Sequence, residues 1–133
     1  PGPTGGEASI GCFGGSVASM AWKVEFSVDA EADLELIFDH LFESYVAFGE
    51  STEEAVDRAS MRLERIVDAA DRICKAPHRG TIREEVAPGL RNLTIDRAIY
   101  WFDLDEQRET VRILAVFFGP QDHVRHMLIR LLG

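Results

Sequence analysis

Apolar and polar positions follow regular periods from Trp22 onward, and these periods predict a strand followed by a helix. Residues 22–26 (WKVEF) alternate apolar and polar side chains, which indicates a short strand with one buried face. From Ala30 to Phe48 the apolar residues recur at the three- and four-residue spacing of a single helix face. Ser27 or Asp29 can cap the start of this helix, and Gly49 is typical of its end.

A second helix is predicted from residue 51 to residue 75. Ser51 with Glu54 three positions later is typical of a capping box, and Pro77 cannot continue the helix. Because only a few residues separate the two helices, we expect them to fold back as an antiparallel hairpin. Their apolar faces need a cover, and the only candidate is a sheet built by the second half of the chain.

Three strands are predicted in that half, at residues 90–95, 98–104 and 110–118, with a hairpin loop at residues 105–109. Residues 81–86 fit a short charged strand or an extended loop. From Leu114 onward the last strand is apolar on both faces, so we expect a central strand or one covered by a partner. Residues 121–132 fit a short helix or an extra strand. The order predicts an α+β fold with a three- or four-stranded antiparallel sheet and the helices on one face.

The first 19 residues are rich in Gly, Pro and Ser and follow neither period. Such a segment buries too little apolar surface to offset its ordering entropy, so we expect a disordered tail or a remnant added for expression. The alternative is a functional N-terminal arm. Residues 20–133 are expected to form a single domain, since 133 residues suffice for one core and not for two.

Charge is distributed unevenly along a chain whose net charge is -9. Residues 20–71 hold fourteen acidic and four basic side chains, whereas residues 72–133 hold ten basic and eight acidic ones. The net sign argues against non-specific binding to nucleic acid, which depends on neutralising phosphates. No apolar run reaches the roughly 18 residues that a membrane span needs, and the start lacks a secretory signal pattern. We therefore expect a cytoplasmic protein with no membrane contact.

The cysteines and histidines do not predict a metal or cofactor site. Cys12 and Cys74 lie far apart in unlike contexts, which indicates neither a disulfide framework nor metal ligands. His123 and His126 are three residues apart and could share a metal ion with Asp122, but no third strong ligand has a suitable spacing. We favour the alternative in which Asp122 caps a helix and His123 lies on the surface.

Four arginines, Arg79, Arg83, Arg91 and Arg97, recur across the loop and the first strands of the predicted sheet. In one interpretation several of them point the same way and form a concave basic patch that binds phosphate or an acidic partner segment. In the other they pair with nearby acids. Their spacing alone leaves both interpretations open.

Four segments together resemble the RelE/ParE superfamily of toxins from type II toxin–antitoxin systems: WKVEFSVDAEADLELIFDHL, KAPHRGTIREEVAPGLRNLTI, RAIYWFDLD and VRILAVFFGPQD. The resemblance covers the chain from Trp22 to about His126. It implies a growth-inhibiting toxin neutralised by a ParD-like antitoxin in a hetero-oligomeric complex that binds operator DNA only through the antitoxin. We expect the antitoxin to dock on the outer face of the sheet.

The superfamily contains two kinds of toxin, and the residues favour one of them. RelE-like members cut mRNA on the ribosome, and Arg97 in RAIY matches their catalytic arginine. After Gly119, however, Gln121 and Met127 stand where those enzymes place an arginine and a tyrosine. The resemblance therefore favours the ParE-like branch, which is associated with plasmid stabilisation and inhibition of DNA gyrase, and no confident catalytic residue follows.

The alternative is a ribosome-dependent mRNA endoribonuclease that uses Arg91, Arg97 and His123. Whichever branch applies, seven residues are candidates for contact with the target or the antitoxin. They are Arg79, Arg83, Arg91, Arg97, Tyr100, Asp122 and His123.

Overall fold

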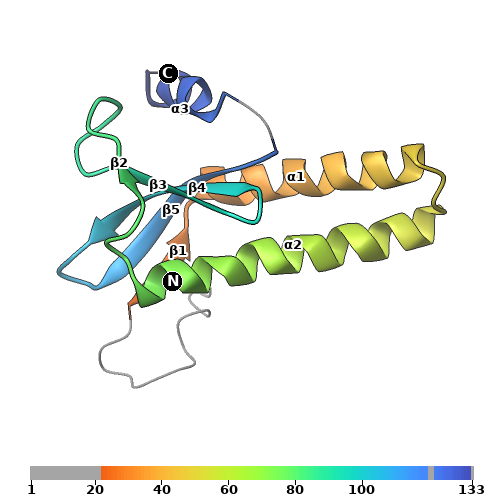
Figure 1. The fold of residues 1–133 in the computed structure, drawn as a ribbon, viewed down its shortest axis with the longest axis horizontal. Helices are drawn as coiled ribbons and strands as arrows, with labels where there is room; N and C mark the ends of the chain where they lie inside the picture. The colour runs from red at the N-terminus through yellow and green to blue at the C-terminus, as the bar shows by residue number, and fades with distance from the viewer. Residues whose placement is uncertain (1–21, 120–121, 133) are drawn as a thin grey trace.

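The computed structural model describes residues 22–119 and 122–132, which form an α+β fold with helices on both sides of one sheet (Figure 1). The elements in order are β1 (Lys23–Phe26), α1 (Val28–Ala47), α2 (Thr52–Lys75), β2 (Thr81–Ile82), β3 (Arg91–Ile95), β4 (Ala98–Asp105), β5 (Thr110–Phe118) and α3 (His123–Leu132). This order confirms the predicted succession of strand, helical hairpin and strands. The predicted tail at residues 1–19 lies outside the described residues.

The two long helices begin at side chains that satisfy their first backbone N–H groups. The Ser27 hydroxyl accepts a hydrogen bond from the Ala30 amide at 3.0 Å, so Ser27, one of the two predicted capping residues, caps α1. Ser51 and Glu54 form the predicted capping box at the start of α2. Gly49, with a φ of 103°, follows α1 in the left-handed region that glycine adopts readily.

The sheet has five strands in the order β1-β5-β4-β3-β2. The strands β2 to β5 pair antiparallel in sequence order, as predicted. The first strand, β1, pairs parallel with the last, β5, with Lys23 opposite Thr110 and Phe26 opposite Ile113. The helical hairpin, β2, β3 and β4 all come between these two neighbours along the chain. β5 lies between β1 and β4, so it is an interior strand of the sheet, as its apolar residues on both faces predicted.

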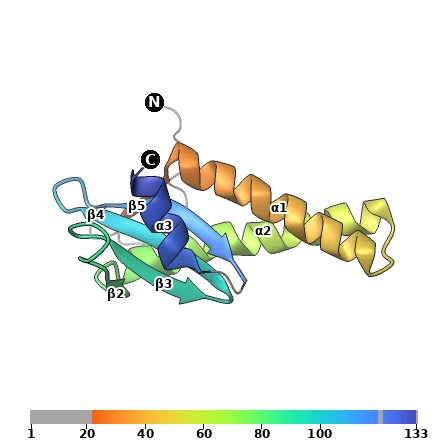
Figure 2. The same cartoon turned by 90° about the horizontal axis from the view of Figure 1, so that it is seen from above.

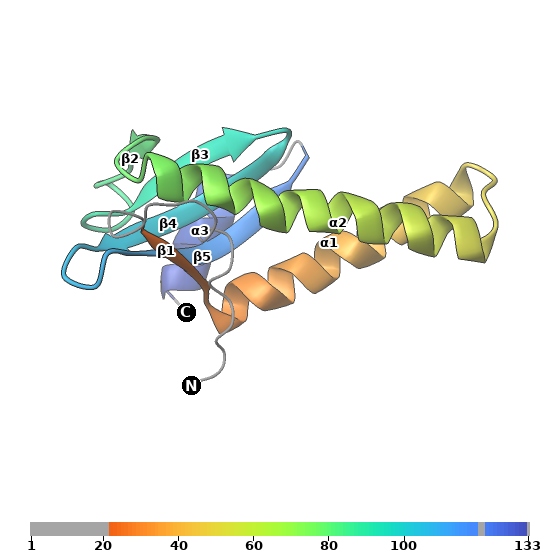
Figure 3. The same cartoon turned by 90° about the horizontal axis from the view of Figure 1, so that it is seen from below.

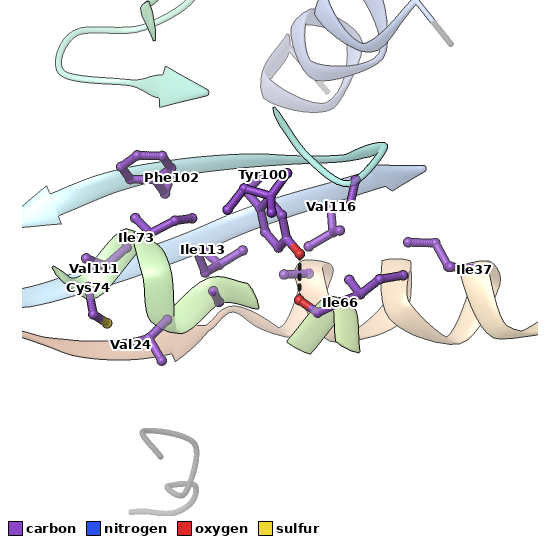
Figure 4. Close-up of a cluster of buried hydrophobic side chains, with 14 of the residues drawn as sticks. Val24, Ile37, Ile66, Ile73, Cys74, Tyr100, Phe102, Val111, Ile113 and Val116 are labelled. Atoms are coloured by element: carbon purple, nitrogen blue, oxygen red, sulfur yellow. Dashed lines mark hydrogen bonds between the residues drawn. The ribbon is translucent and has the colours of Figure 1, made fainter. Parts of the chain in front are cut away.

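The main core lies between the sheet and the helical hairpin (Figures 3 and 4). Tyr100 and Phe102 of β4 and Ile113 of β5 are fully buried there against Ile73 of α2. The two α-helices also pack on each other, and beyond the sheet they extend as a projecting hairpin (Figure 1). Phe48 and Met61 are large exposed apolar side chains in this part of the chain.

A second, smaller core covers the outer face of the sheet. α3 lies over this face (Figure 2), and its Met127 is 1% exposed against a cluster from β4, β5 and the segment before β3. The cluster consists of Leu90, Ile99, Trp101, Ala115 and Phe117. We expected an antitoxin to occupy this face, but in this structure the chain itself covers it. The C-terminal element is thus a helix, one of the two alternatives that the sequence left open.

Replacing Gly80 with alanine is expected to lower the free energy of unfolding by about 2 kcal/mol, because two penalties combine. Gly80 has a φ of 92°, and a Cβ atom there would lie 2.7 Å from the backbone oxygen of Asn92. Urea denaturation of the variant measures the loss.

Gly89→Ala is the matched control. Gly89 has a φ of 75° but nothing within 4 Å of the added Cβ, so only the conformational penalty of about 1 kcal/mol applies. Equal losses in the two variants would contradict a role for the close approach between the Gly80 segment and β3.

Candidate functional site

The turn between β3 and β4 places Arg97 at the meeting point of two hollows in the surface. Ile95 pairs with Ala98, so Asp96 and Arg97 are the two residues of a tight hairpin turn. Their φ values are 50° and 73°, as in the turn type that prefers Asn-Gly. The long cationic side chain of Arg97 thus occupies a position whose backbone conformation glycine would adopt at a lower energetic cost.

The first hollow, named here the α2 pocket, lies between α2 and the β3–β4 turn and has a volume of about 360 Å³. Arg62 and Arg65 of α2 line it together with Arg97. Ile66 and Ile95, both buried, supply apolar surface. The pocket therefore combines positive charge with an apolar lining.

The second hollow, named here the α1–α3 groove, has a volume of about 680 Å³. It is lined by Leu36 of α1, Phe117 of β5, His126 of α3 and Arg97. Leu36 is 66% exposed and adds apolar surface to the groove.

The ring of Phe118 joins the two hollows by holding two arginines. The Cζ atoms of Arg62 and Arg97 lie 5.1 Å and 5.7 Å from the centroid of this ring, within cation–π range. Arg62 also donates a hydrogen bond from Nη2 to the backbone oxygen of Asp96 at 3.1 Å. These contacts fix the β3–β4 turn against the end of β5.

A partly buried ion pair between Asp33 of α1 and Arg130 of α3 forms one wall of the groove. The guanidinium donates two hydrogen bonds to the carboxylate, at 2.8 Å and 3.0 Å, and the Val116 amide donates a third at 2.9 Å. The hydrogen bond with Asp33 raises the pKa of Arg130 above its usual range. This pair connects the helices on the two sides of the sheet.

Tyr100, a candidate contact residue, is a core residue in this structure. Its side chain has no exposed surface, and its hydroxyl donates to the backbone oxygen of Ile66 at 2.6 Å (Figure 4). Burial raises the pKa of this phenol well above its usual value. Tyr100 is therefore not available to a target or a partner.

The three residues of the nuclease alternative are not brought together. Arg91 pairs with Phe102 on the face of the sheet that meets the helical hairpin, and it donates a hydrogen bond to the backbone oxygen of His78 at 2.8 Å. Arg97 lies beyond the other end of β3, roughly 15–20 Å away along an extended chain. His123 lies on the outer face against Trp101.

His123 and Asp122 begin α3. The Asp122 carboxylate accepts a hydrogen bond from the Arg125 amide at 3.2 Å, which is the predicted capping role. Trp101 donates from its indole nitrogen to Nδ1 of His123 at 3.2 Å. Burial and the nearby Arg83 lower the pKa of His123, against the opposing effect of Asp122. Among the described residues, no cluster of histidine, cysteine and carboxylate side chains could hold a metal ion.

The stability of this structure is expected to fall as the pH drops below about 6.5, the ordinary pKa of histidine. The folded-state pKa of His123 is lowered, so the unfolded chain binds the proton more readily. The stabilisation is complete above the unfolded pKa and is lost as the pH falls through the folded one. A protonated ring also cannot accept the hydrogen bond from Trp101.

Urea denaturation followed by tryptophan fluorescence at about pH 8 and pH 5.5 measures this loss, since histidine titrates between them. In His123→Asn the side-chain oxygen can accept the indole hydrogen bond without titrating, so the part of the loss due to His123 should disappear. A His126→Asn variant serves as control. The same pH dependence in both variants and in the unaltered chain would exclude His123 as the cause.

The remaining arginine candidates do not form one patch. Arg83 pairs with the carboxylate of Glu85 at 3.3 Å, as the pairing interpretation expects, whereas Arg79 is exposed on the loop after α2. Arg97 instead joins Arg62 and Arg65, which sequence reasoning missed. Their three-residue spacing on α2 was the available signal, but the sequence does not show which strand turn lies beside them.

Two further expectations concern the cysteines and the membrane. Cys74 is buried and takes part in a disulfide, so the expectation of no disulfide is wrong for this residue, while Cys12 lies outside the described residues. Within residues 22–119 and 122–132, no helix is long and apolar enough to cross a membrane.

Comparison with known proteins gives similarity in structure alone. No protein-family model and no curated protein sequence matches the chain. A chain of the chromosomal ParDE toxin–antitoxin system from P. aeruginosa superposes with a TM-score of 0.57 at 22% identity, covering 77% of this chain and 100% of that one. A chain of the toxin–antitoxin complex RelBE2 from Mycobacterium tuberculosis gives a TM-score of 0.53 at 19% identity, covering 76% and 94%.

Proposed function

Since the chain has the fold of the RelE/ParE superfamily toxins, we propose that it is the toxin of a type II toxin–antitoxin module with ParE-like activity. It inhibits growth by binding DNA gyrase in the cytoplasm. A ParD-like antitoxin neutralises it in a hetero-oligomeric complex, and only the antitoxin contacts operator DNA. Of the two neighbours compared above, the ParDE chain has both the higher TM-score and the higher identity.

The separation of Arg91, Arg97 and His123 is the observation that favours binding over RNA cleavage. Cleavage of a phosphodiester requires a proton-transfer group and a charge-stabilising group at the same phosphate. Here Arg91 and His123 lie on opposite faces of the sheet. Met127, at the position where a RelE-like toxin has its tyrosine, is a residue of α3 and is buried against the outer face of the sheet. The nuclease set is therefore not assembled.

A specific observation supports keeping the nuclease as the second candidate. Arg97 has no ion pair within the described part of the chain and lines both hollows, so its charge is available to a phosphate. In that case Arg97 would stabilise the charge that develops during cleavage.

Two assays with purified protein distinguish the candidates. In the first, the toxin is mixed with gyrase and relaxed plasmid, and the proposal expects that gyrase no longer introduces supercoils into the plasmid. In the second, it is mixed with translating ribosomes and mRNA, and the proposal expects intact mRNA. Cleavage of mRNA with unaffected supercoiling would overturn the ParE-like assignment. Inactivity in both assays would overturn both candidate activities and favour an inactive scaffold that serves only antitoxin-linked repression.

Arg97→Ala gives an independent test in cells. The nuclease candidate requires this arginine, so growth inhibition would be lost with the variant. The ParE-like proposal does not place Arg97 in any chemical step, and growth inhibition on induction should persist. Arg125→Ala, which removes an exposed arginine on α3, is the matched control.

A further inference from the structure

We propose that the α2 pocket binds a carboxylate on an acidic, partly apolar peptide segment of a protein partner. The proposal concerns Arg62, Arg65 and Arg97 and the apolar surface beneath them. It rests on the proposed function only in identifying that partner as the antitoxin.

The positive charges of the α2 pocket are not balanced by the part of the chain that the structure describes. Its three arginines form no ion pair with any described carboxylate, although the chain contains 23 acidic residues. Elsewhere Arg112 pairs with Asp103, and Arg130 pairs with Asp33. Among the described residues that line the pocket, only Asp96 carries a carboxylate. An additional negative group from outside would therefore meet a net positive site.

The lining of the pocket selects the kind of anion. Ile66 and Ile95 line the pocket together with the arginines and are buried. The hydroxyl of Tyr100 already donates a hydrogen bond to the backbone oxygen of Ile66 in α2. A carboxylate carried on a side chain can contact the guanidiniums while its CH₂ groups and an apolar neighbour cover this surface. Guanidinium groups bind planar carboxylates with paired hydrogen bonds, and a partly apolar lining strengthens the attraction.

A nucleic acid fits the same surface less well. A phosphate backbone needs several basic side chains in a row, whereas the pocket holds about 360 Å³, enough for a few side chains. Glu64, Asp68 and Asp71 lie on the same helix as Arg62 and Arg65, and the chain as a whole carries a net charge of -9. This field repels a polyanion at longer range but has less effect on a single carboxylate in contact with arginine.

The conformation of the β3–β4 turn gives a way to separate binding from folding. Arg97 has a φ of 73°, so replacing it with glycine should relieve the turn and leave stability unchanged or improved. A residue kept only for stability would not behave in this way. Arg97→Gly should therefore weaken binding in a chain that remains folded.

The test uses the full chain and an N-acetylated, C-amidated peptide of sequence Leu-Asp-Glu-Leu as the probe, followed by NMR chemical shifts. We expect saturable shifts at residues of the α2 pocket. Arg97→Gly and Arg65→Ala should each weaken binding by about tenfold, the effect of losing one charge-assisted hydrogen bond. Arg125→Ala, at an exposed arginine of α3 that does not line the pocket, should leave the affinity unchanged. Thermal denaturation of each variant checks that it remains folded.

The control ligands are the peptide Leu-Asn-Gln-Leu, inorganic phosphate and a hexamer of deoxythymidine. Absence of saturable shifts with the acidic peptide, equal affinity for its amide counterpart, or undiminished binding by Arg97→Gly would each overturn the proposal. Tighter binding of phosphate or of the oligonucleotide would also overturn it in favour of a nucleic-acid site. None of these results depends on gyrase or ribosome assays, so failure here leaves the proposed function to its own tests.

Discussion

Asp33→Ala is expected to lower the free energy of unfolding by about 3 kcal/mol, because removing the buried carboxylate of a partly buried ion pair leaves its hydrogen-bonding partners unsatisfied. Asp33 is 5% exposed and accepts hydrogen bonds from Arg130 and from the Val116 amide. We place the loss at the lower end of the usual range because Arg130 is 28% exposed and water can solvate it. Urea denaturation measures the change.

Asp39→Ala provides the control for the Asp33 variant, since Asp39 is an exposed aspartate on the same helix. Its expected change is within about 0.5 kcal/mol of zero. A double-mutant cycle with Arg130→Met isolates the pair, and a coupling free energy of about 1–3 kcal/mol is expected for groups in direct contact. A loss for Asp33→Ala no larger than that for Asp39→Ala would show that the pair does not stabilise the fold.

Trp101→Ala is expected to lower the free energy of unfolding by about 3–5 kcal/mol, the usual loss for a large aromatic residue in a core. Trp101 has no exposed surface and supports α3 in two ways. It belongs to the same apolar cluster as Met127, and its indole donates to the His123 ring. Denaturation measures the total loss, and hydrogen exchange of the α3 amides shows whether this helix loosens first.

The second tryptophan offers a matched comparison. Trp22 is only partly buried and contacts His78 edge-on at 5.7 Å between ring centroids. We expect Trp22→Ala to lower the free energy of unfolding by about 1–2 kcal/mol, since less apolar area is lost. Similar losses for the two variants, or unchanged exchange in α3 after Trp101→Ala, would contradict the role assigned to the outer cluster.

Much of the fold follows from local patterns in the sequence. The capping box at Ser51, the stop before Pro77 and the alternation from Thr110 to Phe118 each depend on neighbours a few residues apart. Such signals predict elements and their approximate ends. They also predict antiparallel pairing of consecutive strands, because short turns leave little choice.

Other features depend on contacts that local patterns do not carry. The parallel pairing of β1 with β5 and the ion pair between Asp33 and Arg130 join distant segments. The apolar residues on the outer face of β5 predicted that another surface packs against this face. Periodicity cannot show whether that surface belongs to a partner or to the chain's own α3. Tyr100 shows the same limit, since an alternating strand has two faces and the sequence does not say which one meets the helices.

The candidate site was predicted only in part. Arg97 could be named because it matches a family motif, whereas Arg62 and Arg65 became visible only when α2 was placed beside the β3–β4 turn. Conversely, the nuclease alternative grouped Arg91 and His123 with Arg97 in one site, but in the structure these residues lie apart. A binding surface assembled from a helix and a turn has no short sequence signature.

The pairing of β1 with β5 also sets an order of events during synthesis. Ser27 and Leu114, which meet beside this strand pair, are 87 positions apart, and Asp33 and Arg130 are 97 positions apart. The helical hairpin contains mostly local contacts and can form while the ribosome is still adding residues. The sheet cannot close until β5 has emerged, and α3 cannot dock until residue 130 is free. Folding of this protein is therefore completed only after nearly all of its described residues have left the ribosome.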